Sequence, residues 1–169
     1  MTTEEIQAAI QAEATRQGVN PALALAVAEH ESSFNPNALG AAGDAGLFQL
    51  IPSTQRQYGV TNPFDISQNI QGGVSLLRDL TAKYGDNLAA ILQSYNGGEG
   101  NYDRGTVSTA ARNYSVVVSG LFNRWLNDLG IGTSSPGVTG DSPGDFLPAA
   151  LTRARSVTRR SPAPASRVA

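Results

Sequence analysis

The stretch PALALAVAEHESSFNPNALG, residues 21–40, decides the fold of this chain. A helix is expected to begin here, because Asn20 is a good N-cap residue and the proline after it fits the first helical position. A run of alanine, leucine and valine follows. It ends in three neighbouring ionisable residues, Glu29, His30 and Glu31, just before a loop rich in asparagine, proline and glycine. The sequence therefore predicts an apolar helix with a charged end.

Helical periodicity distinguishes the three charged residues. Successive residues rotate by about 100° around a helix, which places Val27 about 40° and Glu31 about 80° from Leu23. Glu31 thus continues the buried stripe, where a partly desolvated carboxyl group has a raised pKa and suits general-acid chemistry. Glu29 lies well off this arc and is predicted to be solvated, and His30 is predicted to be structural or exposed. The alternative, that all three lie on a solvated helix end, remains open.

Four further segments show helical periodicity, whereas strand signals are few. Thr3 is a candidate cap of the first, and Asp65 a candidate cap of a longer one, with Gln68 three residues on as in a capping box. In the last segment an apolar stripe of period four is predicted to be buried; it consists of Val117, Leu121, Trp125 and Leu129. The predicted helices lie at 3–17, 66–84 and 107–130 and within 86–100, where the pair Gly97–Gly98 is predicted to stop the helix. One or two short helices are expected within 45–59. The fold class is mainly α, with little or no β-structure.

The composition excludes several classes of protein. The chain has 169 residues, no cysteine and a single histidine, which excludes disulfides, thiolate chemistry and a histidine-rich metal site. The net charge of −2 argues against a nucleic-acid binder. No apolar run approaches the length of a membrane-spanning helix. The opening residues MTTEEIQAAI lack the basic and apolar regions of a secretory signal.

Charge and composition change near residue 129. Residues 1–129 carry 7 Lys and Arg against 12 Asp and Glu, whereas residues 130–169 carry 5 Arg against 2 Asp. The change coincides with GIGTSSPGVTGDSPGD, a composition typical of linkers. We therefore expect a globular domain at 1–129. At 130–169 we expect a Gly/Ser/Pro linker and a basic tail, either disordered or docked on a larger protein assembly.

Four motifs follow one another along the chain. Residues 31–54 read Glu-Ser, Asn-Pro-x-Ala, Gly-x-x-Gly-Leu-Phe-Gln-Leu and Pro-x-Thr. Residues 69–84 contain Asn-Ile-x-x-Gly followed by leucines and a tyrosine, residues 95–98 read Tyr-Asn-Gly-Gly, and Thr109 precedes Tyr114. In their order and spacing these motifs resemble the soluble lytic transglycosylases, the goose-type branch of the lysozyme superfamily. The family usually has methionine in place of the phenylalanine of the first motif, a difference that bears on one sugar subsite.

The resemblance implies a lysozyme-like helical domain with a cleft for peptidoglycan glycan strands. Glu31 would be the single catalytic acid and base. It would protonate the glycosidic oxygen between N-acetylmuramic acid and N-acetylglucosamine, then accept the proton of the muramoyl 6-hydroxyl as a 1,6-anhydro ring closes. An ordinary glycosidase needs two carboxylates. Here the substrate's own hydroxyl replaces water, so that one carboxyl group serves both steps and neither metal nor cofactor is required.

Five further positions line the family's cleft. Ser32 and Tyr114 are candidate hydrogen-bond partners of the catalytic carboxyl group. Gln49 and Asn96 can bind N-acetyl and hydroxyl groups, because amides both donate and accept. The alternative for each is structural: Gln49 could fix its own loop, and Tyr95 could be a core residue with a satisfied hydroxyl. The candidate substrate-binding residues are thus Ser32, Gln49, Tyr95, Asn96 and Tyr114.

Asp44 departs from the family pattern, which often has a small apolar residue here. The goose-type lysozymes, which are hydrolases, carry an acidic residue in the corresponding loop. If Asp44 faces Glu31 across a gap that holds a water molecule, it could act as general base and give a reducing product of inverted configuration. The alternative is a loop residue in an Asx-type turn beside Gly43. A third reading is a non-catalytic module that binds the wall or has a structural role.

The site of action follows from the expected substrate. An enzyme that cleaves peptidoglycan acts in the bacterial periplasm or cell wall. Because no signal peptide is visible in this sequence, we expect delivery by a phage virion or by a secretion apparatus.

Overall fold

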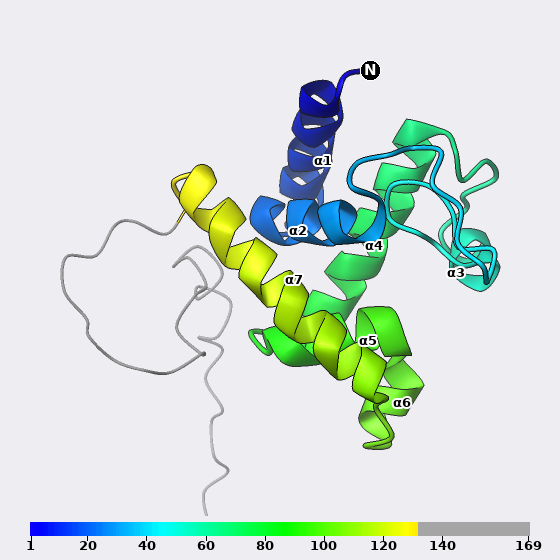
Figure 1. The fold of residues 1–169 in the computed structure, drawn as a ribbon, viewed down its shortest axis with the longest axis vertical. Coiled ribbons are helices and arrows are strands. Elements are labelled where there is room, and N and C mark those ends of the chain that lie inside the picture. Colours follow the sequence, from blue (N-terminus) through cyan, green and yellow to red (C-terminus); the bar gives the residue numbers. More distant parts are fainter. Residues whose placement is uncertain (132–169) are drawn as a thin grey trace, which may run out of the picture.

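Seven helices make up residues 1–131, the part of the chain that the computed structural model describes (Figure 1). In this part, strand pairing is limited to two isolated bridges, Leu39 with Ala45 and Ala45 with Leu50. The predicted mainly helical fold class is confirmed. The helices are α1 (Thr3–Gln17), α2 (Pro21–Ser32), α3 (Pro52–Gln57), α4 (Ile66–Tyr84), α5 (Leu88–Gly97), α6 (Glu99–Asp103) and α7 (Thr109–Asp128).

The ends of the described range bear on two predictions. The linker and tail predicted at 130–169 lie outside the described residues, apart from the first two positions. Within residues 1–131, no helix has both the length and the apolar character that crossing a membrane requires.

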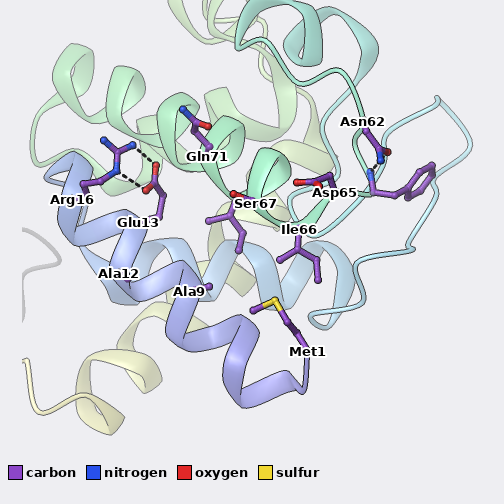
Figure 2. Close-up of a pocket in the computed structure, with 12 residues that line it drawn as sticks. Met1, Ala9, Ala12, Glu13, Arg16, Asn62, Asp65, Ile66, Ser67 and Gln71 are labelled. Carbon is purple, nitrogen blue, oxygen red and sulfur yellow. Dashed lines mark hydrogen bonds and ion pairs between the residues drawn. The ribbon is translucent and has the colours of Figure 1, made fainter.

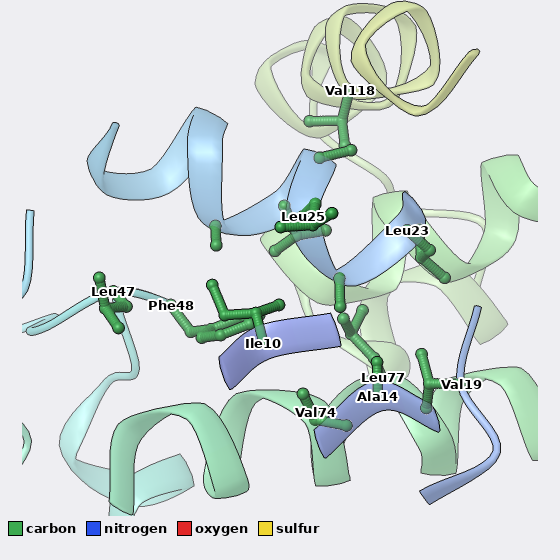
Figure 3. Close-up of a cluster of buried hydrophobic side chains, with 14 of the residues drawn as sticks. Ile10, Ala14, Val19, Leu23, Leu25, Leu47, Phe48, Val74, Leu77 and Val118 are labelled. Atoms are coloured by element: carbon green, nitrogen blue, oxygen red, sulfur yellow. The ribbon is translucent and has the colours of Figure 1, made fainter. Parts of the chain in front are cut away.

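Helix α2 lies at the centre of the domain. All seven residues from Ala22 to Ala28 are buried, and α2 packs against α1, α4 and α7. Figure 3 shows Leu25 of α2 among core side chains of other elements, including Ile10 of α1 and Val118 of α7. A helix that is apolar all round is buried on every side. The one-sided buried stripe predicted for this helix was therefore wrong, and its neighbours, not its own periodicity, determine which charged residue at its end is covered.

Two predictions about helix starts need correction. Helix α1 is capped by Thr2 and not by Thr3, because the Thr2 hydroxyl accepts from the Glu5 N–H at 3.2 Å while the Glu5 carboxylate accepts from the Thr2 N–H at 2.8 Å. Asp65 caps α4 as predicted and accepts from the Gln68 N–H at 2.9 Å. The Gln68 side chain, however, accepts N–H groups of the preceding loop, and no reciprocal capping box forms.

The buried stripe of α7 lies one residue from the predicted one. Val117 is 51 % exposed, and the other members of the predicted stripe are only partly buried. The buried series is Ala111, Tyr114, Val118, Phe122 and Leu126. Both series are apolar at a four-residue spacing, so periodicity alone does not separate them. The packing of the helices separates them, because Tyr114 faces α2 and the residues on the same face of α7 are therefore buried as well.

The last correction concerns the helix predicted within 86–100. Helix α5 ends at Gly97, as the glycine pair predicted, but a separate short helix, α6, begins at Glu99. The pair therefore divides two helices.

Two glycines of α4 allow the loops on either side of α3 to pack closely. A Cβ atom at Gly73 would lie 2.2 Å from the ring of Phe48, before α3, and one at Gly72 would lie 2.6 Å from Val60, after α3. Real Cβ atoms do not approach other heavy atoms this closely, so larger residues would displace these loops. Phe48 is itself wholly buried. It packs in the core, so any effect of this residue on a sugar subsite would be indirect, through the loop that it anchors.

A groove of about 950 Å³ lies between α1 and the start of α4 (Figure 2). On one side it is lined by Glu13 and Arg16, which form an ion pair, and on the other by residues such as Phe64 and Ile66. None of its lining residues is a predicted site residue. The groove is therefore separate from the site described next.

Candidate active site

Glu31 lies in the last turn of α2, where the chain changes direction sharply. The helix ends at Ser32, and the next two residues, Ser33 and Phe34, have the left-handed backbone angles φ 51° and 62°. This conformation is uncommon for a residue as bulky as phenylalanine. Phe34 is held there by burial and by edge-on packing against Trp125, with ring centroids 6.2 Å apart. The abrupt end leaves the Glu31 side chain half-buried at the junction of α2, the following loop and α7.

An aromatic group from α7 binds this carboxyl group. The hydroxyl of Tyr114 donates a hydrogen bond of 2.7 Å to Oε1 of Glu31. The Tyr114 ring is stacked on Tyr95 of α5, with centroids 6.3 Å apart and planes within 6°, and it meets the exposed His30 edge-on at 4.9 Å. The carboxyl group therefore faces a wall of two stacked phenols rather than bulk water.

The surroundings act on the pKa of Glu31 in opposite directions. Burial raises the pKa, the hydrogen bond from Tyr114 lowers it and the negative charge of Asp44 raises it, and together they place the pKa at about 7. Burial also raises the pKa of both Tyr95 and Tyr114 well above the ordinary value, and the Glu31 carboxylate adds to both shifts. The phenols thus stay protonated at neutral pH, while Glu31 can exchange a proton there. This is the property that a residue acting first as acid and then as base requires.

Replacing Tyr114 by phenylalanine should raise the pKa of Glu31, because the variant loses the hydrogen bond that favours the carboxylate. Activity that needs the protonated carboxyl group falls as the pH rises through about 7 in the wild type. In the variant this decline should begin at a higher pH, and kcat should be about tenfold lower, because a bond to a charged group is lost. A pH–rate profile measures both. An unchanged profile would contradict this role of the hydroxyl.

Three side chains from three helices fasten the loop opposite Glu31. The Ser32 hydroxyl of α2 lies 2.9 Å from the Leu47 carbonyl, and the Tyr95 hydroxyl of α5 donates to the Phe48 carbonyl at 2.8 Å. Asn69 of α4 is fully buried. It accepts from the Phe48 N–H at 2.8 Å and donates to the carbonyls of Ala45 and Pro63, each at 2.9 Å. These bonds fix the main chain at residues 45–48.

Ser32 and Tyr95 therefore have structural partners. The Ser32 hydroxyl is directed to main-chain carbonyls, with Ala28 as the second at 3.1 Å, and no bond joins it to Glu31. The structural alternative weighed for Tyr95 matches its position, since its hydroxyl is satisfied by the main chain. Of the two predicted hydrogen-bond partners of Glu31, the structure brings only Tyr114 to it.

The two candidate amides differ in their surroundings. Gln49 has a left-handed backbone, φ 44°, and its Nε2 donates to the carbonyls of Ala38 and Gly46 at 3.1 and 2.8 Å. Its amide nitrogen thus fixes its own loop, which leaves Oε1 as the group for a ligand. Asn96 lies exposed at the end of α5.

Asp44 is a loop residue, but its hydrogen bond is not that of an Asx turn, which would use an N–H two residues later in the chain. Its Oδ1 accepts from the Ala42 N–H at 3.1 Å, and its carboxylate packs so closely on Gly40 that a Cβ atom there would lie 1.8 Å from it. The carboxylate nevertheless acts on Glu31, because its charge contributes to the raised pKa of that group.

Glu29 was predicted to be solvated, and this prediction was wrong. Its side chain is 24 % exposed, its Oε2 accepts a hydrogen bond of 2.7 Å from the indole N–H of Trp125, and it forms an ion pair with Arg124. Periodicity within α2 could not find this partner, because the covering element, α7, lies almost 100 residues later in the chain. His30 is exposed, as predicted.

No group of three or more potential ligand side chains, His, Cys, Asp or Glu, is arranged for a metal ion within residues 1–131.

Within residues 1–131 the architecture is helical, and a half-buried glutamate lies beside a tyrosine. The family of transglycosylase SLT domains matches residues 8–117, and the chain belongs to this family. The resemblance drawn from the four motifs is confirmed.

Several curated proteins are similar in sequence. The chain is 43 % identical over 89 residues to the transglycosylase of Enterobacteria phage PRD1, a match that covers 53 % of this chain and 33 % of that protein. It is 38 % identical over 98 residues to the membrane-bound lytic murein transglycosylase F of Desulfosudis oleivorans, covering 54 % of this chain and 22 % of that protein. The matches thus span a third or less of the length of these relatives.

Solved structures share the fold. An inactive mutant of the lytic transglycosylase Slt from Pseudomonas aeruginosa superposes with a TM-score of 0.65 at 20 % identity, covering 73 % of this chain and 24 % of that one. The 70 kDa soluble lytic transglycosylase of Escherichia coli gives a TM-score of 0.62 at 21 % identity, with 72 % and 24 % covered. At such low identity the likeness concerns the fold alone.

Proposed function

We propose that this domain is a peptidoglycan lytic transglycosylase in which Glu31 carries both proton transfers. The observation that carries the proposal is the carboxyl group itself. It is half-buried, it accepts a hydrogen bond of 2.7 Å from Tyr114, and its pKa is raised to about 7. Membership of the SLT family and similarity to proteins named as murein transglycosylases support the same activity.

The opposing influences on Glu31 suit the two halves of the reaction. In the first half the protonated carboxyl group, which burial favours, donates its proton to the glycosidic oxygen, and the bond from that oxygen to C1 of N-acetylmuramic acid breaks. The carboxylate that remains is stabilised by the Tyr114 hydroxyl. In the second half it accepts the proton of the 6-hydroxyl as O6 bonds to C1. Glu31 is then protonated again, and no water is consumed.

The remaining candidate residues receive roles consistent with their contacts. We propose that Oε1 of Gln49 and the exposed amide of Asn96 bind N-acetyl or hydroxyl groups of the glycan strand. Ser32 and Tyr95 act indirectly, by fixing the loop at residues 45–48 that carries Gln49.

Product analysis tests the reaction type. Purified peptidoglycan digested with this chain should release muropeptides that end in 1,6-anhydro-N-acetylmuramic acid. Each is lighter by one water than the reducing product of hydrolysis, which mass spectrometry resolves. Reducing ends alone would contradict the transglycosylase assignment and favour a lysozyme-type hydrolase.

A specific observation favours the hydrolase as second candidate, namely that the charge of Asp44 reaches Glu31. We expect Asp44→Asn to retain most of the activity and to form the same anhydro products. The pKa of Glu31 should fall slightly, because a like charge is removed. If Asp44 is instead a general base, the variant should lose about a hundredfold or more in rate. Initial rates and product masses, measured together, decide between the two.

We further propose that the domain acts on the bacterial cell wall after delivery by a phage virion or a secretion apparatus. Its similarity to a phage transglycosylase supports the first route. Immunodetection of the chain in purified phage particles tests this. Its absence from particles, together with its presence in secreted fractions of the bacterium, would favour the second route.

A further inference from the structure

We propose that Glu29 is a positioning residue, which holds α7 on α2 in the placement that brings the Tyr114 hydroxyl to Glu31. This inference rests on the proposed role of Glu31 in the reaction. It concerns Arg124 and Trp125, which lie beyond the residues 8–117 that the family matches.

Two donors from α7 converge on the Glu29 carboxylate. The indole N–H of Trp125 and the guanidinium of Arg124 both contact its Oε2. The guanidinium also lies over the Trp125 ring, 5.2 Å from the centroid, and its Nε is 3.9 Å from Asp128. A carboxylate that is only 24 % exposed costs free energy unless it is paired. Any shift of α7 that breaks these contacts is therefore opposed.

The contact of Glu29 with α7 lies on the opposite side of α2 from the Glu31 carboxyl group. Residues 29 and 31 are separated by about 200° around the helix axis. Their partners on α7, Trp125 and Tyr114, are eleven residues apart, which corresponds to about 16 Å along a helix. Helix α7 is thus attached to the end of α2 at two points, one on either side, as it runs diagonally past α2 in Figure 1.

Two separate contacts between α2 and α7 restrict rotation of one helix relative to the other more than a single contact would. Without the Glu29 contacts, α7 would keep the Tyr114–Glu31 bond and its apolar packing on α2 and α5, but no directional contact near its C-terminal end would oppose a small rotation that changes the hydroxyl–carboxylate distance. The apolar contacts of Val118 oppose separation of the helices but are not directional. The Glu29 contacts are directional, because an indole N–H and a guanidinium each require an acceptor in line. We infer that they set the angle at which α7 crosses α2.

The test measures the carboxyl group directly. In Glu29→Ala the pKa of Glu31, followed by ¹³C NMR of its labelled carboxyl carbon, should rise in the same direction as in Tyr114→Phe. With peptidoglycan as substrate, kcat should fall about tenfold while KM stays nearly constant. Glu29→Gln, which still accepts the indole N–H, should restore much of the loss. Trp125→Phe, which keeps the ring but removes the donor, should reproduce part of it.

A double substitution and a matched control isolate positioning from loss of stability. Adding Glu29→Ala to Tyr114→Phe should leave the pKa of Glu31 where Tyr114→Phe alone puts it, because the contact then has no hydroxyl to position. The control is Glu13→Ala, which removes a covered, ion-paired carboxylate from α1. It should lower stability without changing the pKa of Glu31.

Two results would overturn the inference. One is a Glu29→Ala variant that melts earlier but keeps both the pKa of Glu31 and kcat. The other is an additive effect in the double variant. Failure of the proposed function is distinguishable from either, because the NMR titration needs no substrate: if the wild type cleaves no peptidoglycan, the activity is wrong, whereas the coupling of Glu29 to Glu31 is still measured.

Discussion

Replacing Glu31 by glutamine should lower the rate of muropeptide release by about a thousandfold or more. Glutamine has nearly the size of glutamate, and its amide oxygen can still accept the hydrogen bond from Tyr114. The fold and the cleft are therefore expected to stay intact. The variant nevertheless has no proton to donate to the glycosidic oxygen and no carboxylate to accept one from the 6-hydroxyl, so both halves of the proposed reaction fail.

The control for this substitution is Asp86→Asn, which removes one exposed carboxylate distant from the candidate site. It changes the net charge by the same amount and should leave the rate unchanged. If Glu31→Gln released muropeptides as fast as this control, the catalytic role would be wrong, and a module that binds the wall without cleaving it would become the better description.

Glu31→Gln lowers the rate but should raise the stability of the domain at high pH. The pKa of Glu31 is raised from 4.5 to about 7 on folding, so the folded state binds this proton more tightly than the unfolded state does. The associated stability is fully present below about pH 4.5 and is lost as the pH rises through about 7. Glutamine has no such proton. At pH 8, urea denaturation should therefore show Glu31→Gln to be more stable than the wild type by about 1–3 kcal/mol, with the advantage absent near pH 4.5.

Replacing Gly46 by alanine should destabilise the domain by about 4 kcal/mol or more. Gly46 has a left-handed backbone, φ 78°, and a Cβ atom there would lie 2.2 Å from the Pro63 carbonyl oxygen and 2.3 Å from the amide nitrogen of Asn69. The main chain and a fully buried, fully bonded amide cannot both move aside without breaking hydrogen bonds. Because these bonds fix the loop that carries Gln49, activity should fall as well. Urea denaturation measures the loss of stability.

Gly59→Ala separates crowding from backbone strain. Gly59 has nearly the same backbone angle, φ 69°, but nothing lies within 4 Å of the position a Cβ atom would take. The substitution should cost only the strain of a left-handed alanine, about 1–2 kcal/mol. Equal losses in the two variants would show that the contacts of Gly46 do not contribute.

The sequence predicted those features that depend on local chemistry. The cap at Asp65 and the helix break at Gly97 follow from residue types and spacing, and the structure has them. The choice of Glu31 as the candidate catalytic residue needed the motif as well. Because α2 is buried on all sides, helical periodicity alone does not show which of its residues face inward.

Features that depend on a distant partner were not predictable in this way. The side chain of Glu29 is covered by Trp125, and the face of α7 is set by Tyr114, so each assignment requires knowledge of which helices pack together. Ser32 shows the same limit: it is adjacent to Glu31 in the sequence, yet its hydroxyl bonds to the carbonyl of Leu47, fifteen residues later. The spacing of residues in one sequence does not show which of several possible partners a polar side chain will bind.

The hydrogen bond between Glu31 and Tyr114 joins positions 83 residues apart. During synthesis on the ribosome, α2 is made early and α7 is the last of the seven described helices to be made. A chain interrupted before Tyr114 contains the acidic residue but neither the phenol that binds it nor the cover that raises its pKa. The proposed activity therefore requires that α7 dock, and incomplete translation products or fragments cut between α5 and α7 should be inert.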